Sequence, residues 1–346
     1  MKFVVSVQDV WKIFGVRQNE ALAAIKAEGL SKSEVLKRFD CVVGVSGATF
    51  DIPVGEIFCV MGLSGSGKST LVRHVNRLLE PTTGRILING QDVMSLDETQ
   101  LRKLRARHIG MVFQNIALLP HRTVRENVAL PLEVQDVSRS KRFEIAEDVL
   151  RRVNLSGWED KYPHELSGGM QQRVGLARAM AADPDILLMD EPFSALDPLI
   201  RRQLQDQFLE LSAAMRKTTI FITHDLDEAI RIGHRIAIMK DGAIVQIGTP
   251  EEIVTNPADE YVEDFVAGIS KLNLIYARTI MEPFDTAECP DLDRVTCPKA
   301  LESHNLNQLI DLAAGARQPL LIQSDTGQIT GIISKDRLLR AIQRGK

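Results

Sequence analysis

The stretch GLSGSGKST, residues 62–70, constrains the fold more than any other part of the sequence. It lies between the apolar run EIFCVM, which predicts a buried strand, and LVRHVNRLL, whose apolar residues recur at helical spacing. The pattern G-x-x-x-x-G-K-[ST] is met by Gly62, Gly67, Lys68 and Ser69. Residues this small and flexible cannot form a core, so the order strand, loop, helix predicts a phosphate-binding loop.

This loop has the composition of an anion site. Its glycines allow backbone N–H groups to turn inward, and the helix beginning at Lys68 directs the positive end of its dipole at the same anion. Lys68 adds a charge for the β- and γ-phosphates of a nucleoside triphosphate, and Ser69 is a ligand for Mg²⁺. We expect the phosphates to contact Ser64, Gly65, Gly67, Lys68, Ser69 and Thr70. The loop alone is shared by kinases, GTPases and helicases.

An acidic pair lies at the end of another apolar run, ILLMDEP, where Asp190 ends the run and Glu191 follows it. The ends of parallel strands face the ligand crevice of an α/β sheet. We therefore expect Asp190 to hold Mg²⁺ through the water shell of the ion. Glu191 is expected to polarise the water that attacks the γ-phosphate.

The composition argues against several classes of protein. A net charge of −4 gives no basic footprint for a nucleic-acid partner. No apolar run reaches the roughly 18 residues that cross a bilayer, and the N-terminal segment has no signal-peptide pattern. Four cysteines, none in a CxxC pattern, indicate reduced thiols in the cytosol, with a metal or disulfide at Cys289 and Cys297 as the open alternative.

Helix and strand patterns alternate from residue 62 to about 250, which predicts an α/β fold. The buried strands of this region are expected in the runs IGMVF, DILLMD, TTIFIT and RIAIM. Ahead of the loop, residues 3–15 and 42–60 predict strands. Residues 115–165 are charged and helical in pattern, which indicates an inserted helical subdomain.

Two segments do not belong to this alternation. Residues 16–40 predict two short helices, the first ended by Gly29 and the second started by a capping box of Ser31 and Glu34. In residues 271–346, the runs PLLIQ, SDTGQ, ITGIIS and KDRLLRAI predict a β-hairpin followed by a helix. This second segment indicates a small α+β unit at the C-terminus.

The motif LSGGMQQR, residues 166–173, resembles the signature of the ABC transporter ATPases, with Met170 where that family more often has Gln. The other motifs of the family follow in its order: MVFQN with Gln114, SALD with Asp197, and FITHD with His224. The resemblance covers residues 1–270. It implies a P-loop, RecA-like ABC ATPase domain with an N-terminal antiparallel β part and an inserted helical subdomain.

The resemblance also implies a head-to-tail homodimer. Ser167, Gly168 and Gly169 open the helix MQQRVGLARAMAA, so they form a second anion site with a bare backbone. One chain of this family cannot bring that site to its own phosphate loop. Two ATP molecules would each lie between Lys68 of one subunit and Ser167 of the other, with Asp197 also at the nucleotide.

Further roles around the nucleotide are implied by the resemblance. His224 would contact the γ-phosphate and hold the attacking water with Glu191, and Gln114 would bind and sense Mg²⁺. Phe14, in KIFG, occupies the place of the aromatic residue that stacks on adenine in this family, with Trp11 as the alternative.

The type of ABC protein follows from what accompanies the motifs. The sequence has no membrane helices like those fused to exporters, and one phosphate loop where translation-factor members carry two. It has no heptads like those of the DNA-repair members, so an importer subunit remains. The segment LLPHRTVRENVALPL, residues 118–132, resembles the importer segment that receives the coupling helix of a membrane permease.

Two additions resemble the ATPases of glycine betaine, proline and choline uptake. The insertion at 16–40 is similar to one in that group, as are MGLSGSGKST, ALDPLIR and THDLDEA. The stretch QPLLIQSDTGQITGIISKDRLLRAI resembles a CBS module, present in one copy where that group often carries two. We expect this tail to be a regulatory or dimer-stabilising unit, with a domain that only packs as the alternative. A methionine-importer ATPase is the rival, since it also has a small α/β tail but lacks the insertion.

The resemblance therefore implies an ATPase, with ATP and Mg²⁺, at the cytoplasmic face of the inner (plasma) membrane. Its partners would be a membrane permease and an external solute-binding protein, and its solute a methylated amine such as glycine betaine, choline or trimethylamine N-oxide. The alternatives are an amino-acid importer ATPase for proline, histidine or methionine, and a soluble regulatory P-loop ATPase. Because the solute does not touch this subunit, the sequence does not identify it.

Overall fold

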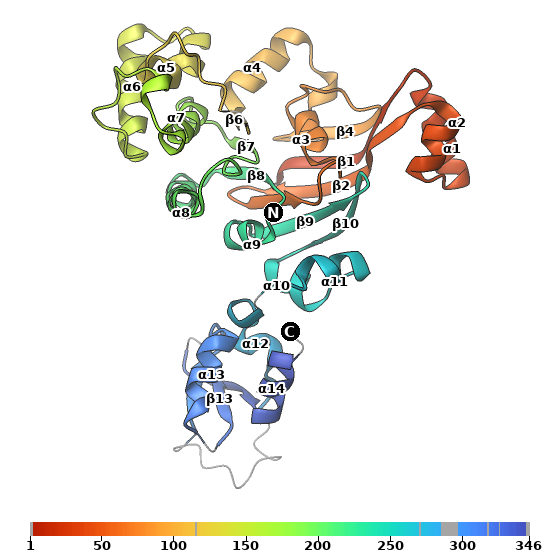
Figure 1. The fold of residues 1–346 in the computed structure, drawn as a ribbon, viewed down its shortest axis with the longest axis vertical. Helices are drawn as coiled ribbons and strands as arrows, with labels where there is room; N and C mark the ends of the chain where they lie inside the picture. The colour runs from red at the N-terminus through yellow and green to blue at the C-terminus, as the bar shows by residue number, and fades with distance from the viewer. Residues whose placement is uncertain are drawn as a thin grey trace. The chain divides into compact units, whose positions relative to one another are not determined.

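The computed structural model describes residues 3–114, 116–269, 271–284, 297–316, 318–324 and 326–343. The chain divides into a large unit, Met1–Ile247, and a small unit, Gly248–Lys346 (Figure 1). This division differs from the predicted boundary at residue 270. Glu251 accepts hydrogen bonds from Arg278 and Thr279, which ties the segment after Gly248 to the small unit.

The large unit is built on a six-stranded sheet of order β10-β9-β3-β8-β7-β6. The bounds of its strands are β3 Ile57–Met61, β6 Ile109–Val112, β7 Ile186–Asp190, β8 Thr218–Thr223, β9 Arg235–Lys240 and β10 Ala243–Gly248. β3 pairs in parallel with both β8 and β9, and β7 pairs in parallel with both β6 and β8. Every residue of β3, β7 and β8 is buried, as expected for parallel strands with both faces covered. The predicted α/β fold is confirmed.

A second sheet contains the N-terminal strands in the order β2-β1-β4-β5, paired antiparallel. Its strands are β1 Phe3–Phe14, β2 Val42–Pro53, β4 Thr83–Ile88 and β5 Gln91–Asp92. The predicted strand at 42–60 divides into β2 and β3 at a turn, where Gly55 has a φ of 81° that favours glycine. The inner faces of both sheets share one hydrophobic core.

The helices of the large unit that follow the phosphate loop connect the strands or extend from them. They are α3 Lys68–Val75, α4 Glu98–His108, α5 Val124–Val134, α6 Arg139–Arg152, α7 Gly168–Met180, α8 Pro198–Met215 and α9 Leu226–Ile232. α5 and α6 pack together beside α7 and form the helical subdomain predicted at residues 115–165 (Figure 1).

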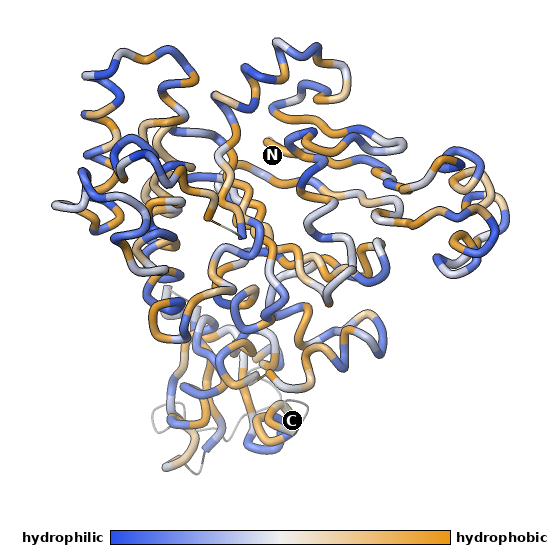
Figure 2. The backbone as a smooth tube through the Cα atoms, turned by 45° about the horizontal axis from the view of Figure 1, so that its top comes forward, coloured by the Kyte–Doolittle hydropathy of each residue, from blue (hydrophilic) through white to orange (hydrophobic). Residues whose placement is uncertain are grey.

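The insertion at 16–40 forms two helices, α1 Gln18–Glu28 and α2 Lys32–Phe39. It leaves and re-enters the second sheet at neighbouring points, because Phe14 and Val42 are partners in the β1–β2 register. Both helices contain hydrophobic as well as hydrophilic residues (Figure 2). Their apolar sides share a small core of Ile13, Ala21, Ala24, Val35, Phe39, Cys41 and Val43. The caps agree with the sequence prediction, with Gly29 ending α1 and a capping box at Ser31 and Glu34 starting α2.

The small unit has its own sheet of order β11-β14-β13-β12 and its own core. Its elements are α10 Pro250–Thr255, α11 Glu260–Val266, α12 Ala277–Ile280, β11 Glu282–Pro283, β12 Lys299–Leu301, α13 Leu306–Ala314, β13 Leu320–Gln323, β14 Ile329–Ile333 and α14 Lys335–Gln343. β13 and β14 form the predicted hairpin and α14 the helix after it. Cys297 is buried, while Cys289 lies outside the described residues. Among the described residues, no helix has the length and apolarity needed to cross a membrane.

Candidate active site

The phosphate loop joins β3 to α3 and is pressed against neighbouring backbone. A Cβ at Gly62 would lie 2.2 Å from Met239 O, and one at Gly67 would lie 2.2 Å from Gly44 O. Both glycines also have positive φ values, 152° and 103°. No other residue fits at either position, so the loop motif is required for the chain to pass through this space.

Lys68 is the first residue of α3, and its side chain folds back over the loop. Its Nζ donates to Gly62 O at 2.8 Å and to Leu63 O at 3.1 Å. Burial lowers the pKa of Lys68, while the carboxylates of Glu191 and Asp190 act in the opposite direction. The ammonium is therefore held at the loop, where it is partly desolvated and able to interact strongly with an anion.

Ser69 and Asp190 are brought together from 121 positions apart in the chain. Ser69 Oγ donates to Asp190 Oδ1 at 2.9 Å. Asp190 is buried at the end of β7, and this burial raises the pKa of its carboxyl group against the opposing hydrogen bond from Ser69. A hydroxyl and a carboxylate are oxygen ligands of the kind that Mg²⁺ prefers, so the pair fits this ion. The described residues contain no cluster of three or more His, Cys, Asp or Glu able to hold a metal.

Glu191 follows β7 in the left-handed backbone region, with a φ of 46°. Its N–H donates to Ile222 O at 3.1 Å, which fixes the turn against β8. Glu191 Oε2 lies 3.0 Å from His224 Nδ1 and accepts a hydrogen bond from Gln114 Nε2 at 3.4 Å. Since an ionised carboxylate only accepts, Nδ1 carries the proton in the contact with His224. Strained backbone of this kind is common where a side chain must be aimed at a reacting group.

A cavity of about 740 Å³ connects these groups, and we call it the nucleotide cavity. It is lined by Phe14, Lys32, Val42, Val43, Gly44, Leu63, Ser64, Gly65, Gly67, Lys68, Ser69, Thr70, Gln114, Glu191 and His224. Asp190 is not a lining residue and reaches the cavity through its bond to Ser69. Lys32, Val42, Val43, Gly44 and Leu63 were not predicted for this site. The pattern of the insertion indicated two helices but not which cavity they border.

Phe14 ends β1 and is 41% exposed, so its ring is not a core side chain. The ammonium of Lys12 lies 5.2 Å from the centroid of the ring. A Cβ at Gly44 would lie 2.7 Å from Phe14 Cε2, so glycine at this position makes room for the ring. Trp11, the alternative from the sequence, does not line the cavity, and its Nε1 donates to Asp9 Oδ1 at 2.6 Å.

The residues of LSGGM lie elsewhere on the large unit. Ser167 caps α7, where its Oγ accepts from Met170 N at 3.4 Å, and both Ser167 and Gly168 are exposed. Asp197 caps α8 in the same way, accepting from Ile200 N. None of the predicted residues Ser167, Gly168, Gly169 and Asp197 lines the nucleotide cavity of its own chain.

Comparison with known proteins decides which family these motifs belong to. The model of the ABC transporter family matches residues 45–194. The glycine betaine transport ATP-binding protein OpuAA of Bacillus subtilis is 54% identical over 84% of this chain and 69% of its own length. The trimethylamine N-oxide transport system ATP-binding protein TmoW of Ruegeria pomeroyi is 44% identical over 98% of both chains. The chain belongs to this family of ABC transporter ATP-binding proteins.

Solved structures agree with this assignment. The dimeric post-hydrolysis state of the ATP-binding cassette MJ0796, bound to ADP and phosphate, is 31% identical with a TM-score of 0.60, covering 71% of this chain and 98% of that one. The cbiO1 protein of Clostridium perfringens, at 24% identity and a TM-score of 0.62 over 75% of this chain and 93% of its own, supports the fold alone. The chain is thus the ATP-hydrolysing subunit of an ABC importer, and the predicted fold, function and nucleotide are confirmed.

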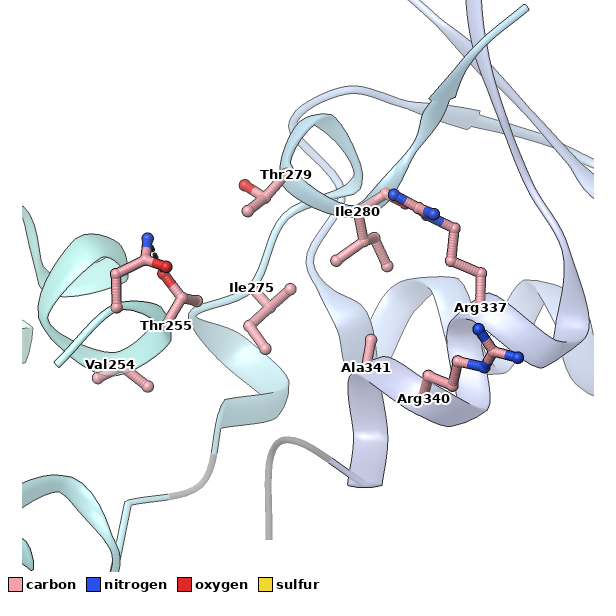
Figure 3. A pocket seen from close by; sticks show the side chains of 9 residues that line it. Val254, Thr255, Ile275, Thr279, Ile280, Arg337, Arg340 and Ala341 are labelled. Atoms are coloured by element: carbon pink, nitrogen blue, oxygen red, sulfur yellow. Dashed lines mark hydrogen bonds between the residues drawn. The ribbon is translucent and has the colours of Figure 1, made fainter. Parts of the chain in front are cut away.

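A second cavity, of about 420 Å³, lies within the small unit of this ABC ATPase, and Figure 3 shows its lining side chains. Two arginines of α14 border it. Arg337 donates to Ile280 O and to Glu282 Oε1, so its guanidinium is held by the unit itself. Arg340 lies one helical turn further along α14 at the same cavity.

Proposed function

We propose that the nucleotide cavity binds and hydrolyses ATP with Mg²⁺ and that the residues described above act in the roles their positions favour. One observation carries this proposal. The carboxylate of Glu191 lies within hydrogen-bonding distance of both His224 and Gln114, in the same cavity as Lys68. A base, a residue that orients it and a phosphate-binding cation thus converge on one space, which is the arrangement that phosphoryl transfer to water needs.

Each residue has a chemical task in this arrangement. The backbone N–H groups of residues 64–70 and the ammonium of Lys68 hold the phosphates and reduce the repulsion felt by an attacking oxygen. Glu191 accepts a proton from the attacking water, while His224 orients that carboxylate and contacts the γ-phosphate. Ser69, Asp190 and Gln114 would hold Mg²⁺. The ion would supply positive charge that offsets the negative charge developing on the phosphates.

The active form is proposed to be a head-to-tail dimer. Ser167, Gly168 and Gly169 form a helix N-terminus that does not line the cavity of their own chain. In the dimer, the anion at this helix N-terminus would be the γ-phosphate of the ATP bound by the partner subunit. Asp197, at the start of α8, would lie at the same interface.

The importer assignment requires a surface for the permease, and the helical subdomain offers one. An apolar cavity of about 330 Å³ is lined by residues of α4, β6, α5 and α7 together with Phe113. Phe113 and Val134 are exposed large hydrophobic side chains there, and Leu130 and Pro131 come from the predicted docking segment at 118–132. We propose that a short helix of the permease docks at this groove. It would hold the ATPase at the cytoplasmic face of the inner (plasma) membrane.

The transported solute is proposed to be a methylated amine, delivered to the permease by an external binding protein. The support is the solute for which each relative is named: glycine betaine for OpuAA and trimethylamine N-oxide for TmoW. The two solutes share a methylated, positively charged nitrogen. The full-length similarity to TmoW and the higher local identity to OpuAA both favour a methylated amine as the solute. They do not distinguish glycine betaine from trimethylamine N-oxide.

The nucleotide chemistry is tested with Glu191→Gln, which keeps the shape of the side chain but removes the base. We expect turnover to fall by about 10²- to 10⁴-fold with ATP binding retained, and a stable dimer on a sizing column when ATP is present. Glu210→Gln, an exposed acid on α8, is the matched control. If Glu191→Gln hydrolyses ATP at the normal rate, Glu191 is not the base. If it binds ATP yet stays monomeric, the head-to-tail dimer with ATP between its subunits is excluded.

The solute is tested by reconstituting the ATPase with its permease and binding protein in vesicles. Betaine, choline, trimethylamine N-oxide, proline, histidine and methionine are then compared for stimulation of ATP hydrolysis. Stimulation by a methylated amine is expected. Stimulation by an amino acid alone would reject the methylated-amine class, and normal basal activity without stimulation by any of the six would reject this set of solutes.

A further inference from the structure

Lys32, the first residue of α2, differs from the other lysines of the insertion because it borders the nucleotide cavity. Its side chain is only 30% exposed. Its ion pair with Asp241 is at the outer limit of contact, 4.0 Å from Nζ to Asp241 Oδ1, and the Asp241 side chain is 75% exposed. Burial lowers the pKa of Lys32, with Asp241 opposing that shift. An exposed pair of this length contributes little energy, so the ammonium is poorly compensated.

The position of Lys32 is fixed by the same core that holds Phe14 and Gly44. Val35 and Phe39, on the buried side of α2, pack with Ile13 and Val43. Ile13 directly precedes Phe14, and Val43 directly precedes Gly44. The helix start is also held by hydrogen bonds between Ser31 and Glu34. Since α2 shares one small core with the chain neighbours of Phe14 and Gly44, Lys32 forms a fixed wall of the cavity.

The surroundings of Lys32 place its charge near the phosphate loop. Asp241 precedes Gly242, whose N–H donates to Ser66 O in the loop at 2.9 Å. An ammonium is a donor without an acceptor, and its surroundings favour an anion. Within a nucleotide whose base stacks on Phe14 and whose terminal phosphates meet Lys68, the part between them carries the α-phosphate and ribose.

We propose that Lys32 is a nucleotide-binding residue whose ammonium pairs with the α-phosphate of the bound nucleotide, so that the insertion at 16–40 forms part of the ATP site. This rests on the proposed function of the cavity. On binding, the ammonium exchanges its weak pairing with Asp241 for a charge-assisted hydrogen bond to phosphate. The contact is the same for ATP, ADP and the transition state, so it strengthens binding and leaves the rate of the bound complex unchanged.

The test compares dissociation constants for ATP, ADP, AMP and adenosine in the full chain and in Lys32→Gln. A hydrogen bond to a charged group at a partly exposed site predicts about tenfold weaker binding of ATP, ADP and AMP, with kcat unchanged and adenosine unaffected. Lys32→Arg should recover most of the affinity. The difference between the full chain and Lys32→Gln should shrink as salt is added, because a partly exposed charge is screened.

Two control variants separate the outcomes. Lys37→Gln removes the same charge from an exposed position on α2 and should leave all four constants unchanged. Lys68→Ala should lose ATP affinity, which tests the cavity itself. Normal ATP binding by Lys32→Gln beside a loss in Lys68→Ala would overturn the role of Lys32 and leave the proposed function standing. An equal loss in Lys37→Gln, or an equal loss for adenosine, would also overturn the contact with phosphate.

Discussion

If Phe14 stacks on the adenine ring, Phe14→Ala should weaken nucleotide binding by an amount that can be estimated. The ring ends β1 and borders the nucleotide cavity, and the absence of a side chain at Gly44 leaves room for it. Stacking of a base on an aromatic side chain is worth about 1–3 kcal/mol by alanine substitution. Phe14 is already 41% exposed, so its removal creates no fully buried cavity and adds little packing cost. We therefore expect a loss of about 1–2 kcal/mol, or roughly 5- to 30-fold in Kd.

Titration calorimetry with ATP and ADP gives the required constants, and steady-state hydrolysis gives kcat and KM. Both nucleotides should lose the same factor, and KM should rise with kcat unchanged, because adenine is held equally before and during the reaction. Phe14→Trp should keep the affinity. Gly44→Ala should weaken it by displacing the ring, since the new Cβ would lie 2.7 Å from Phe14 Cε2.

Phe3 provides a matched control at the other end of β1, where it is 45% exposed. Phe3→Ala should leave both dissociation constants unchanged. Unchanged binding in Phe14→Ala would refute the stacking assignment. If Trp11→Ala then weakened binding, the alternative drawn from the sequence would replace it.

Three further predictions concern other parts of the chain. Burial raises the pKa of Asp190, and only its ionised form binds a cation. The Mg²⁺ concentration needed for half-maximal activity should therefore fall as pH rises through that raised pKa. Asp190→Asn should remove this dependence, and an unchanged pH profile in the variant would exclude Asp190 as a ligand. Val134→Asp, which adds a charge to an exposed side chain of the apolar groove, should leave the ATPase activity of the isolated subunit within about twofold but abolish its co-purification with the permease; retained co-purification would reject the groove. Removal of residues 275–346 should leave basal hydrolysis intact and change its response to salt or adenine nucleotides, while an identical response would mean that the tail only packs.

Local chemistry explains why much of the chain was predictable. The phosphate loop, the buried run ending at Asp190 and the capping box at Ser31 are each encoded by adjacent residues. The hairpin and helix of the small unit follow from alternating patterns in the same way. Such features depend on neighbours in the chain, so the sequence alone predicts them.

The features that escaped prediction depend on residues far apart in the chain. Lys32 borders the same cavity as the phosphate loop because the insertion returns to the sheet beside Phe14. The turn that separates β2 from β3 interrupted a pattern that otherwise continued through residues 42–60. The division of the chain at Gly248 reflects the hydrogen bonds of Glu251 to residues near 279, which no local pattern contains.

The left-handed backbone at Glu191 has a consequence for how this ATPase can change. A residue with a Cβ is strained there by roughly 1 kcal/mol, and glycine would relieve that strain while deleting the carboxylate. Laboratory selection for thermal stability alone should therefore enrich Glu191→Gly, a more stable variant that has lost ATP hydrolysis. Any screen intended to improve this protein must reward turnover and folding together, because at this one position they favour opposite residues.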